Sequence, residues 1–313
     1  MNIVALAGGV GGAKLAHGLV LAPTLTLPQQ IGRGNLTIIV NTGDDFDLYG
    51  LHISPDLDTV TYTLAGLANP DTGWGVAGDT FEFINALRRL GGEAWFGIGD
   101  RDLATHVLRT QQLRQCKTLT EATQAITRSL NIDPLILPMT DDRVRTMLDT
   151  DQGLLEFQDY FVRRRWQPRI RSIEFVGASM ARPTRQVADT LQQADAIIIC
   201  PSNPFVSIDP ILSLVTPCKG KPVLAVSPIV GGEAIKGPAA KMFAELGFEP
   251  SALAVAQHYR GLVTHFVLDQ VDAAQESAIQ SLRLQTLVTN TLMRSVEDRT
   301  RLAGDILQLL SLP

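Results

Sequence analysis

Four glycines between an apolar run and a helical pattern constrain the start of this chain more than any other feature. The segment 8–14 reads GGVGGAK and follows the apolar residues 3–6. Glycine lets backbone amides approach a bound group closely, and the positive end of the following helix favours an anion. We therefore predict a phosphate-binding loop made by Gly8, Gly9, Gly11 and Gly12. Lys14 would place its ammonium as a point charge on the phosphate oxygens.

This glycine loop departs from the two commonest phosphate-binding patterns. A Walker A loop needs Gly-Lys-Ser/Thr, whereas Lys14 stands between Ala13 and Leu15. In a dinucleotide fingerprint read from Gly9, Lys14 takes the place of the last glycine. The alternative interpretation is a glycine turn that lets the helix pack closely, with Lys14 as a solvated surface residue.

Short apolar runs with little polar alternation indicate strands that are covered on both faces. These runs are Asn2–Ala7, Leu36–Val40, Ala94–Ile98, Ala196–Cys200 and Pro222–Ser227. Helical patterns lie between them, at Thr80–Leu90, Arg101–Leu113, Pro183–Gln193 and Pro238–Leu246. The alternation predicts an α/β fold with a Rossmann-like, doubly wound and mostly parallel sheet. Polar loops follow the strands, so we expect one large site at their carboxyl edge.

The segment from about 115 to 170 has a different character. Leu119–Leu130 is expected to be a helix, and Leu135–Met139 is expected to pair with Arg143–Leu148 as a hairpin. Gly153–Trp166 is expected to be a further helix. No linker rich in Ser, Gly or Pro separates this segment. We therefore predict one α/β domain over 1–313, with a mixed helical and hairpin insertion that covers the core and a closing helix at Val296–Leu310.

Composition excludes several classes of protein. A net charge of −5 gives no sign of a general nucleic-acid binder, and no apolar run has the length of about 20 residues that a membrane span needs. The chain enters a strand directly without a basic leader, which favours a cytoplasmic protein. Cys116, Cys200 and Cys218 are widely spaced and form no CxxC pair, so a disulfide framework or a structural zinc site is not expected. Cys200 is expected to be a small buried apolar residue.

Two acidic segments follow the second strand, at 41–47 and 54–59. Their carboxylates are solvated turn residues on one interpretation. On the other they ligate Mg²⁺, which prefers oxygen ligands and shares them with substrate phosphates. We favour the metal, with Asp45 and Asp58 as ligands and Asp44 and Asp56 next. Asp58 also stands where it could cap a helix that begins at Thr59.

The third segment, 97–106, leaves an apolar run and enters a helix. Arg101 is a candidate clamp for a phosphate or a planar polar ring. Asp100 is on the simplest interpretation a helix cap. His106 lies near the other charged groups, but a lone histidine is more often structural than a general base.

Two later loops complete the expected site. Ser202 and Asn203, in the rigid Pro-rich loop 200–210, suit recognition of a nucleotide base or sugar, although an ordinary strand-to-helix connection explains them nearly as well. Gly231 and Gly232 would admit a phosphate or a bulky ligand close to the backbone, and Lys236 adds positive charge. A site of glycine, carboxylate, lysine and arginine suits phosphoryl or nucleotidyl transfer, in which positioning and charge neutralisation carry most of the catalysis. Asp45 and Lys14 are therefore also the expected catalytic residues.

The ordered set of motifs resembles one family, the 2-phospho-L-lactate transferases of deazaflavin coenzyme (factor 420) biosynthesis. The matching pieces run from residue 8 to about 242 and read GGVGGAK, NTGDD, SPDLDTVTYTLAG, GIGDRDLATH, LPMTDDRV, CPSNPFVSI and SPIVGGEAIKGPAAKM. The resemblance implies transfer of a 2-phospholactyl or enolpyruvyl phosphate group from its guanosine diphosphate ester. The acceptor would be 7,8-didemethyl-8-hydroxy-5-deazariboflavin, and GMP would be released. It also implies Mg²⁺ as cofactor, a Rossmann-like core and a homodimer.

The resemblance also implies roles for single residues. Asp58 and Arg101 would contact the deazaflavin, and the glycine loop with Lys14 would hold the donor's diphosphate. Asp45 would be on the metal. For Asp58 the two lines of reasoning differ, since its place in the acidic loop favours Mg²⁺ and the resemblance favours the acceptor.

A related family gives the alternative. Gluconeogenesis-factor-like proteins share the glycine loop and act as non-catalytic, nucleotide-sugar-binding regulators. They typically carry DDGGSSG where this chain has residues 43–50, GDDFDLYG. That difference and the GDRDLATH piece favour the transferase. An ordinary nicotinamide oxidoreductase is disfavoured by the broken dinucleotide fingerprint.

Overall fold

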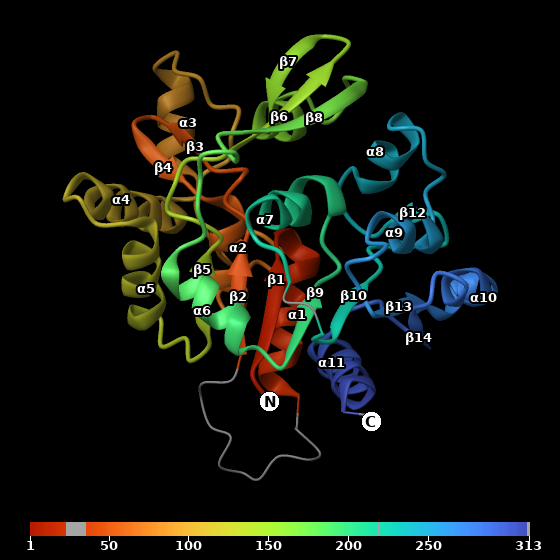
Figure 1. Cartoon of the computed structure of the whole chain (residues 1–313). Coiled ribbons are helices and arrows are strands. Elements are labelled where there is room, and N and C mark those ends of the chain that lie inside the picture. The colour runs from red at the N-terminus through yellow and green to blue at the C-terminus, as the bar shows by residue number, and fades with distance from the viewer. Residues whose placement is uncertain (23–35, 218–219, 312–313) are drawn as a thin grey trace.

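A seven-stranded parallel sheet forms the centre of the molecule in the computed structural model, which describes residues 1–22, 36–217 and 220–311 (Figure 1). The strand order is β14-β13-β10-β9-β1-β2-β5, and every neighbouring pair is parallel. The strands are β1 (Ile3–Ala7), β2 (Leu36–Val40), β5 (Leu135–Pro138), β9 (Ala196–Ile199), β10 (Val223–Val226), β13 (His265–Asp269) and β14 (Gln285–Thr289). The predicted α/β fold with a parallel sheet is thereby confirmed.

The sheet is doubly wound around β1. The chain first adds β2 and β5 on one side of β1, and then returns to add β9, β10, β13 and β14 on the other side. The order reverses between β1 and β9, and ligands of such sheets bind in the crevice beyond the strand carboxyl ends at this switch point. The glycine loop after β1 and the Pro-rich loop after β9 meet there.

Helices cover both faces of the sheet because the strand residues alternate between two apolar clusters. Val4 and Leu6 of β1 belong to the cluster formed with α6 to α9, whereas Ala5 and Ala7 belong to the cluster formed with α1, α2 and α11. The helices are α1 (Gly9–Leu21), α2 (Pro55–Leu64), α3 (Glu82–Arg89), α4 (Asp100–Arg114), α5 (Leu119–Ser129), α6 (Arg185–Gln193), α7 (Asp209–Leu214), α8 (Ala239–Glu245), α9 (Ala252–His258), α10 (Glu276–Gln280) and α11 (Val296–Leu310).

The closing helix α11 packs directly on α1, as its amphipathic pattern predicts. A Cβ atom added to Gly18 would lie 2.2 Å from the carbonyl oxygen of Arg299, so glycine permits the close crossing of the two helices. The N-terminus and the last turn of α11 lie at the same end of the molecule, away from the strand carboxyl ends (Figure 1).

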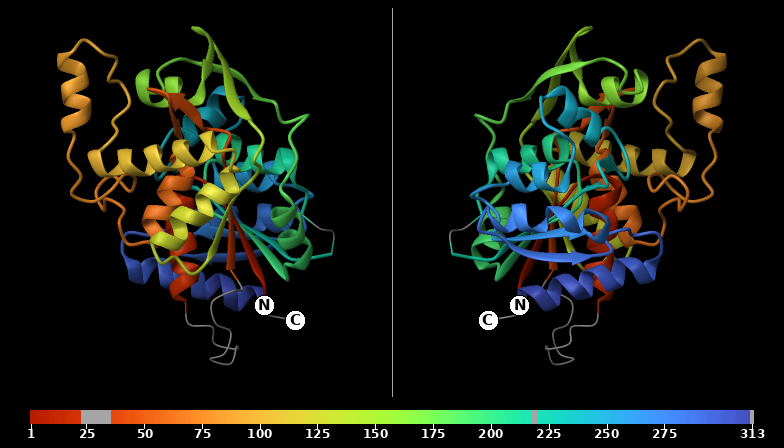
Figure 2. Two further views of the ribbon diagram at one scale, coloured as in Figure 1. Left: turned by 90° about the vertical axis from the view of Figure 1, so that its left-hand side faces the viewer. Right: turned by 90° about the vertical axis from the view of Figure 1, so that its right-hand side faces the viewer.

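A small antiparallel sheet stands over the carboxyl ends of the parallel strands. It has the order β7-β6-β8 and consists of β6 (Arg145–Thr150), β7 (Gly153–Glu156) and β8 (Ile170–Val176). Figures 1 and 2 show it rising from the core on the side where the strands end, while α3 projects from the body beside it. Two hairpins, β3 (Phe46–Leu48) with β4 (Leu51–Ile53) and β11 (Ile229–Val230) with β12 (Glu233–Ala234), complete the strands.

Two predictions about the covering segment are wrong. Leu135–Met139 does not pair with Arg143–Leu148, because Leu135–Pro138 joins the edge of the main sheet beside β2, where its last three residues are buried. Arg145–Thr150 pairs instead with β7 and β8. Gly153–Trp166 is not one helix, since it contains β7 and a single π-helical stretch at Asp159–Arg163. The residues at 119–138 therefore belong to the main sheet and its helix layer.

The apolar run Ala94–Ile98 is not a strand, although it was predicted to be one. Its aromatic residues pack on the β3–β4 hairpin instead, with the Phe96 and Trp95 ring centroids 5.0 and 5.9 Å from that of Phe46. Side-chain packing thus accounts for the apolar character of this run.

Cys200 is buried, as expected, whereas Cys218 lies outside the described residues. None of the helices formed by the described residues combines the length and the apolar character that crossing a membrane requires.

Candidate active site

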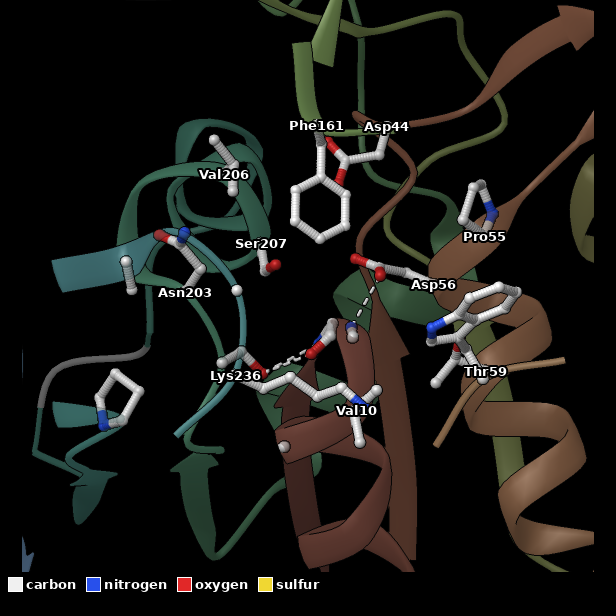
Figure 3. A pocket seen from close by; sticks show the side chains of 18 of the residues that line it. Val10, Asp44, Pro55, Asp56, Thr59, Phe161, Asn203, Val206, Ser207 and Lys236 are labelled. Atoms are coloured by element: carbon white, nitrogen blue, oxygen red, sulfur yellow. Dashed lines mark hydrogen bonds between the residues drawn. The ribbon is translucent and has the colours of Figure 1, made fainter. Parts of the chain in front are cut away.

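A cavity of about 520 Å³ opens at the carboxyl edge of the sheet, around the switch point between β1 and β9 (Figure 3). This volume falls within the range of about 300–1,000 Å³ that is typical of small-molecule sites. Its walls come from the glycine loop, the start of α2, the loop after β9, the segment around Lys236 and the covering residues 157–162. Segments that are far apart in the sequence thus meet in one site, as predicted.

The glycine loop is fixed by hydrogen bonds from both sides. The Gly9 amide donates to Asp56 Oδ1 at 2.7 Å, and the Gly8 amide donates to Ser202 Oγ at 3.1 Å. The Ser202 hydroxyl donates in turn to the Gly8 carbonyl at 2.8 Å. Gly9 has a φ of 59°, a conformation that favours glycine. One amide of the predicted anion site therefore already holds a carboxylate of the protein.

Close packing explains the other two glycines of this loop. A Cβ atom at Gly11 would lie 2.1 Å from the Pro201 carbonyl oxygen, and one at Gly12 would lie 2.6 Å from Ser202 Oγ. The interpretation of the loop as a packing turn is thus correct for these two positions. Gly11 also lines the cavity together with Gly8 and Gly9, whereas Gly12 does not.

Lys14 lines the cavity and has no carboxylate partner among the described residues. Its ammonium donates to the Met293 carbonyl oxygen at 2.9 Å. Burial lowers the pKa of Lys14, and the positive charges of Arg299 and Lys236 lower it further. The electrostatic environment of this ammonium therefore favours an anion in the cavity.

Three carboxylates of the acidic loops are buried close to one another. Asp44 and Asp56 line the cavity, and burial together with the neighbouring carboxylates raises the pKa of both, that of Asp56 to about 6. Asp45 does not line the cavity. Its Oδ2 atom accepts from the Ser54 hydroxyl at 2.8 Å and lies 3.2 Å from His52 Nε2.

A second acidic cluster lies between α2 and α4. Asp58, Asp102 and His106 each offer a ligand atom, and these atoms lie within 4.8 Å of one another. The buried guanidinium of Arg109 forms an ion pair with Asp58, donating from Nη1 to Asp58 Oδ2 at 3.1 Å and from Nη2 to Asp58 Oδ1. The Tyr62 hydroxyl donates to Asp102 Oδ1 at 2.7 Å. The positive charge of Arg109 thus already balances the negative charge of Asp58.

Arg109 is a site residue that was not predicted from the sequence. Asp102, His106 and Arg109 are spaced four and three residues apart, so they share one face of α4. This spacing is the feature of the sequence that could have indicated a shared cluster. Asp58 meets these side chains from α2, which begins at Pro55 and not at Thr59. Asp58 therefore lies inside the first turn and is not the residue that caps this helix.

Arg101 and Asp100 lie away from the cavity. Arg101 is exposed, and its Nη1 donates to the Ala77 carbonyl at 3.4 Å. Asp100 is a helix cap, but for α3, since it accepts from the amides of Glu82 and Phe83. Asp79 does the same for the start of α4.

The later loops contribute unequally. Ser202 and Asn203 line the cavity, together with Val206 and Ser207 from a π-helical stretch at Pro204–Ile208. Gly231 and Gly232 do not line it. They form the β11–β12 turn with φ values of 59° and 81°, and the Gly231 amide donates to the Asp272 carboxylate.

Five aromatic side chains from several segments, together called the aromatic wall, line the same cavity as the charged groups and were not predicted from the sequence. The cavity is lined by Tyr62, Trp74, Phe96, Phe157 and Phe161. Phe157 and Phe161 are stacked, with ring centroids 5.4 Å apart and an interplanar angle of 6°. Figure 3 shows Phe161 pointing toward the space between Asp44 and Asp56. This wall suits a planar ring system.

A doubly wound α/β fold whose glycine loop, lysine and buried carboxylates face one cavity at the switch point defines an enzyme that acts on a phosphorylated small molecule. Comparison with known proteins makes this specific. The chain matches the 2-phospho-L-lactate transferase CofD family over residues 3–298, and it belongs to that family. It is thus a transferase of factor 420 biosynthesis.

Curated relatives of two kinds align over nearly the whole chain. A phosphoenolpyruvate transferase of Streptomyces griseus is 38% identical over 99% of this chain and 98% of its own. A 2-phospho-L-lactate transferase of Methanopyrus kandleri is also 38% identical over 99% of this chain and 98% of its own. A 2-phospho-L-lactate transferase of Methanosarcina mazei is 37% identical over 98% of this chain and 99% of its own.

Among solved structures, a member of the upf0052 family from Bacillus halodurans has a similar fold. It superposes with a TM-score of 0.60 over 99% of this chain and 98% of its own, at 14% sequence identity. At this identity the likeness concerns the fold alone.

Proposed function

We propose that the protein transfers a 2-phospholactyl or enolpyruvyl phosphate group from its guanosine diphosphate ester to 7,8-didemethyl-8-hydroxy-5-deazariboflavin, with release of GMP. The observation that carries the proposal is the single cavity in which an anion-binding helix start and a lysine face buried carboxylates and an aromatic wall. Relatives with either printed name match equally, at 38%, so both donors enter the proposal.

The donor's diphosphate would lie against the start of α1. Asp56 accepts from the Gly9 amide, but the amides of Val10 and Gly11 come next and have no acceptor within the helix. The positive end of the helix and the Lys14 ammonium would stabilise the diphosphate charge there. Ser202 and Asn203 line the same cavity and would contact the nucleoside.

The deazaflavin ring would pack against the aromatic wall, since a planar ring system stacks well on aromatic side chains. Phe157 and Phe161 come from the covering segment, so this segment both binds the acceptor and shields the reacting groups from water. We assign Asp58 to the acceptor, because Arg109 already balances its charge. Its remaining lone pairs can accept from a hydroxyl of the ribityl chain.

The residues of the cavity fit a magnesium ion. Asp44 has a buried Oδ1 atom without a hydrogen-bond partner, and no described cation forms an ion pair with Asp44 or Asp56. Carboxylate oxygens that lack a counter-charge are the ligands that Mg²⁺ prefers. We propose Asp44 as the ligand from the acidic loop, with Asp45 supporting it, and Asp58, Asp102 and His106 as the competing location. When bound, Mg²⁺ would neutralise charge on the diphosphate.

In the transfer step, the terminal hydroxyl of the ribityl chain attacks the phosphorus that bears the organic acid. A new P–O bond forms, the bond to the GMP oxygen breaks, and the hydroxyl proton passes to the phosphate of the departing GMP. The chain's part is positioning and charge stabilisation, as expected for phosphoryl transfer. Lys14 and the α1 amides stabilise the leaving GMP, and the aromatic wall with Asp58 orients the hydroxyl.

The direct experiment mixes the purified protein with the deazaflavin, Mg²⁺ and each guanosine diphosphate ester in turn. We expect stoichiometric GMP and phosphodiester, measured by liquid chromatography with mass spectrometry, from at least one donor. Tight binding of a nucleotide sugar together with no diester from either donor would contradict the proposal.

We also propose a homodimer, as the family resemblance implies. Light scattering coupled to size-exclusion chromatography measures the mass directly. A mass equal to that of one 33.9 kDa chain at micromolar concentration would contradict it.

A further inference from the structure

A second lysine reaches the glycine loop from the other side of the cavity. Lys236 follows β12 and lines the cavity. Figure 3 shows its side chain extending in front of the glycine loop, beside Val10. Lys236 is close enough to Lys14 for its charge to lower the pKa of Lys14. Two ammonium groups from distant segments thus approach the start of α1.

Neither ammonium has a carboxylate partner among the described residues. Lys14 donates to the Met293 carbonyl, and Lys236 donates to the Thr72 carbonyl. A carbonyl oxygen accepts a hydrogen bond but does not cancel the charge. The charges of Lys14 and Lys236 repel each other at the cavity, and Arg299 adds a third positive charge. An anion that binds between the two ammonium groups reduces this repulsion.

The Lys236 ammonium also contacts the loop that carries Trp74. A Cβ atom added to Gly73 would lie 2.6 Å from Val10 Cγ1 and 3.3 Å from Lys236 Nζ, so this loop lies on the glycine loop at the point that Lys236 reaches. An ammonium has three donors. Lys236 can therefore hold the Thr72 carbonyl and still donate to a phosphate.

We propose that Lys236 is a second diphosphate-binding residue, which works with Lys14 to distinguish a nucleoside diphosphate from a monophosphate and ties the Trp74 loop to the bound diphosphate. This inference rests on the proposed function, because it assumes a guanosine diphosphate donor. It adds a residue, from a different segment, that senses the second phosphate and positions one part of the aromatic wall.

The chemical reason for the discrimination is the number of phosphate groups that the two ammonium groups can bind. One ammonium and the α1 amides suffice to bind a single phosphate group. A monophosphate bound there leaves no further phosphate group for the second ammonium, whereas a diphosphate supplies one that it can bind. Loss of Lys236 should therefore weaken binding of GDP far more than binding of GMP.

The experiment measures the dissociation constants of GDP and GMP by titration calorimetry. For Lys236→Met we expect GDP affinity to fall about tenfold or more, the effect of losing a hydrogen bond to a charged group. GMP affinity should stay within about twofold, and Lys236→Arg should keep most of the GDP affinity, since it retains the charge.

Lys221→Met is the matched control. Lys221 also donates to main-chain carbonyls, those of Leu191 and Gln192, but it does not line the cavity. We expect its GDP affinity to equal that of the wild type. The loop contact has its own readout in the background Trp95→Phe, Trp166→Phe, which leaves Trp74 as the single tryptophan of the chain. The fluorescence change caused by GDP should be lost when Lys236→Met is added and kept when Lys221→Met is added.

Two results would overturn the inference. Lys236→Met could bind GDP as tightly as the wild type, or it could lose GDP and GMP affinity by the same factor, which indicates a merely structural role. A wild-type protein that binds neither nucleotide is a different outcome, because it contradicts the guanosine donor of the proposed function itself.

Discussion

The Asp56 carboxylate accepts a hydrogen bond from the Gly9 amide at 2.7 Å, at the N-terminus of α1. The protein thus places its own anion at the first amide of its glycine loop. Asn41 donates to the other carboxylate oxygen at 3.0 Å, and burial raises the pKa of Asp56 to about 6. The site therefore has a carboxylate side and an ammonium side, which suits a metal ion and a diphosphate bound next to each other.

The raised pKa of Asp56 predicts a pH dependence of stability. Between about pH 4, where an unfolded aspartate titrates, and about pH 6, the folded state binds more protons than the unfolded state. The free energy of unfolding therefore decreases as pH rises through this window, and Asp56→Asn should show a smaller decrease than the wild type. Chemical denaturation in metal-free buffer between pH 4 and 7 measures both slopes. Equal slopes would contradict the raised pKa of Asp56. The comparison uses the slopes alone, so a difference in absolute stability between the variant and the wild type does not affect it.

The glycines of the loop can be tested by their packing. Gly11→Ala would bring a Cβ atom within 2.1 Å of the Pro201 carbonyl oxygen, so we expect it to lower the unfolding free energy by about 1–3 kcal/mol. Gly304→Ala is the control. In the interior of α11 a Cβ atom meets nothing within 4 Å, and the better helix propensity should stabilise the protein by up to about 1 kcal/mol. Urea denaturation gives both values, and equal effects at the two positions would refute the packing argument.

The sequence predicts most of the parallel sheet because its strands are apolar runs covered on both faces. The sequence does not predict which strands pair with each other. Leu135–Pro138 looks the same as a hairpin strand and as an edge strand, and only tertiary packing beside β2 decides between them. The strands β13 and β14 were missed, and the pattern of β14 explains why, since none of its residues is fully buried.

The residues of the site can likewise be predicted only in part from the sequence. The rule that ligands bind at the strand carboxyl ends correctly gathers Lys14, Asp58 and Ser202 around one cavity. It is harder to predict which of two adjacent side chains faces the cavity. Asp44 faces the cavity and Asp45 does not, because Asp45 is held by His52 and Ser54, which follow it seven and nine residues later. No local pattern specifies that contact.

The buried ion pair of Arg109 with Asp58 gives a prediction about stability. Arg109→Met keeps the apolar stem but leaves the Asp58 carboxylate buried without its partner, so we expect a loss of about 3–5 kcal/mol. Arg114→Met, on the same helix but exposed, should change stability by no more than about 0.5 kcal/mol. The double variant Asp58→Asn, Arg109→Met should recover part of the loss. A double variant as unstable as the sum of the single ones would show that the pair is not coupled.

The magnesium ligand can be identified by the metal requirement of the variants. Asp44 and Asp45 both have a buried Oδ1 atom without a hydrogen-bond partner, but Asp44 lines the cavity, whereas Asp45 does not and has its Oδ2 atom held by His52 and Ser54. We therefore expect Asp44→Asn to raise the Mg²⁺ concentration for half-maximal turnover about tenfold or more, since the loss of a charged ligand interaction is of that size. Asp45→Asn should lower turnover with a smaller shift in the metal requirement. Asp102→Asn is the variant that decides between the two acidic clusters. If it raises the Mg²⁺ requirement and Asp44→Asn does not, the ion binds beside Asp58 and His106 instead.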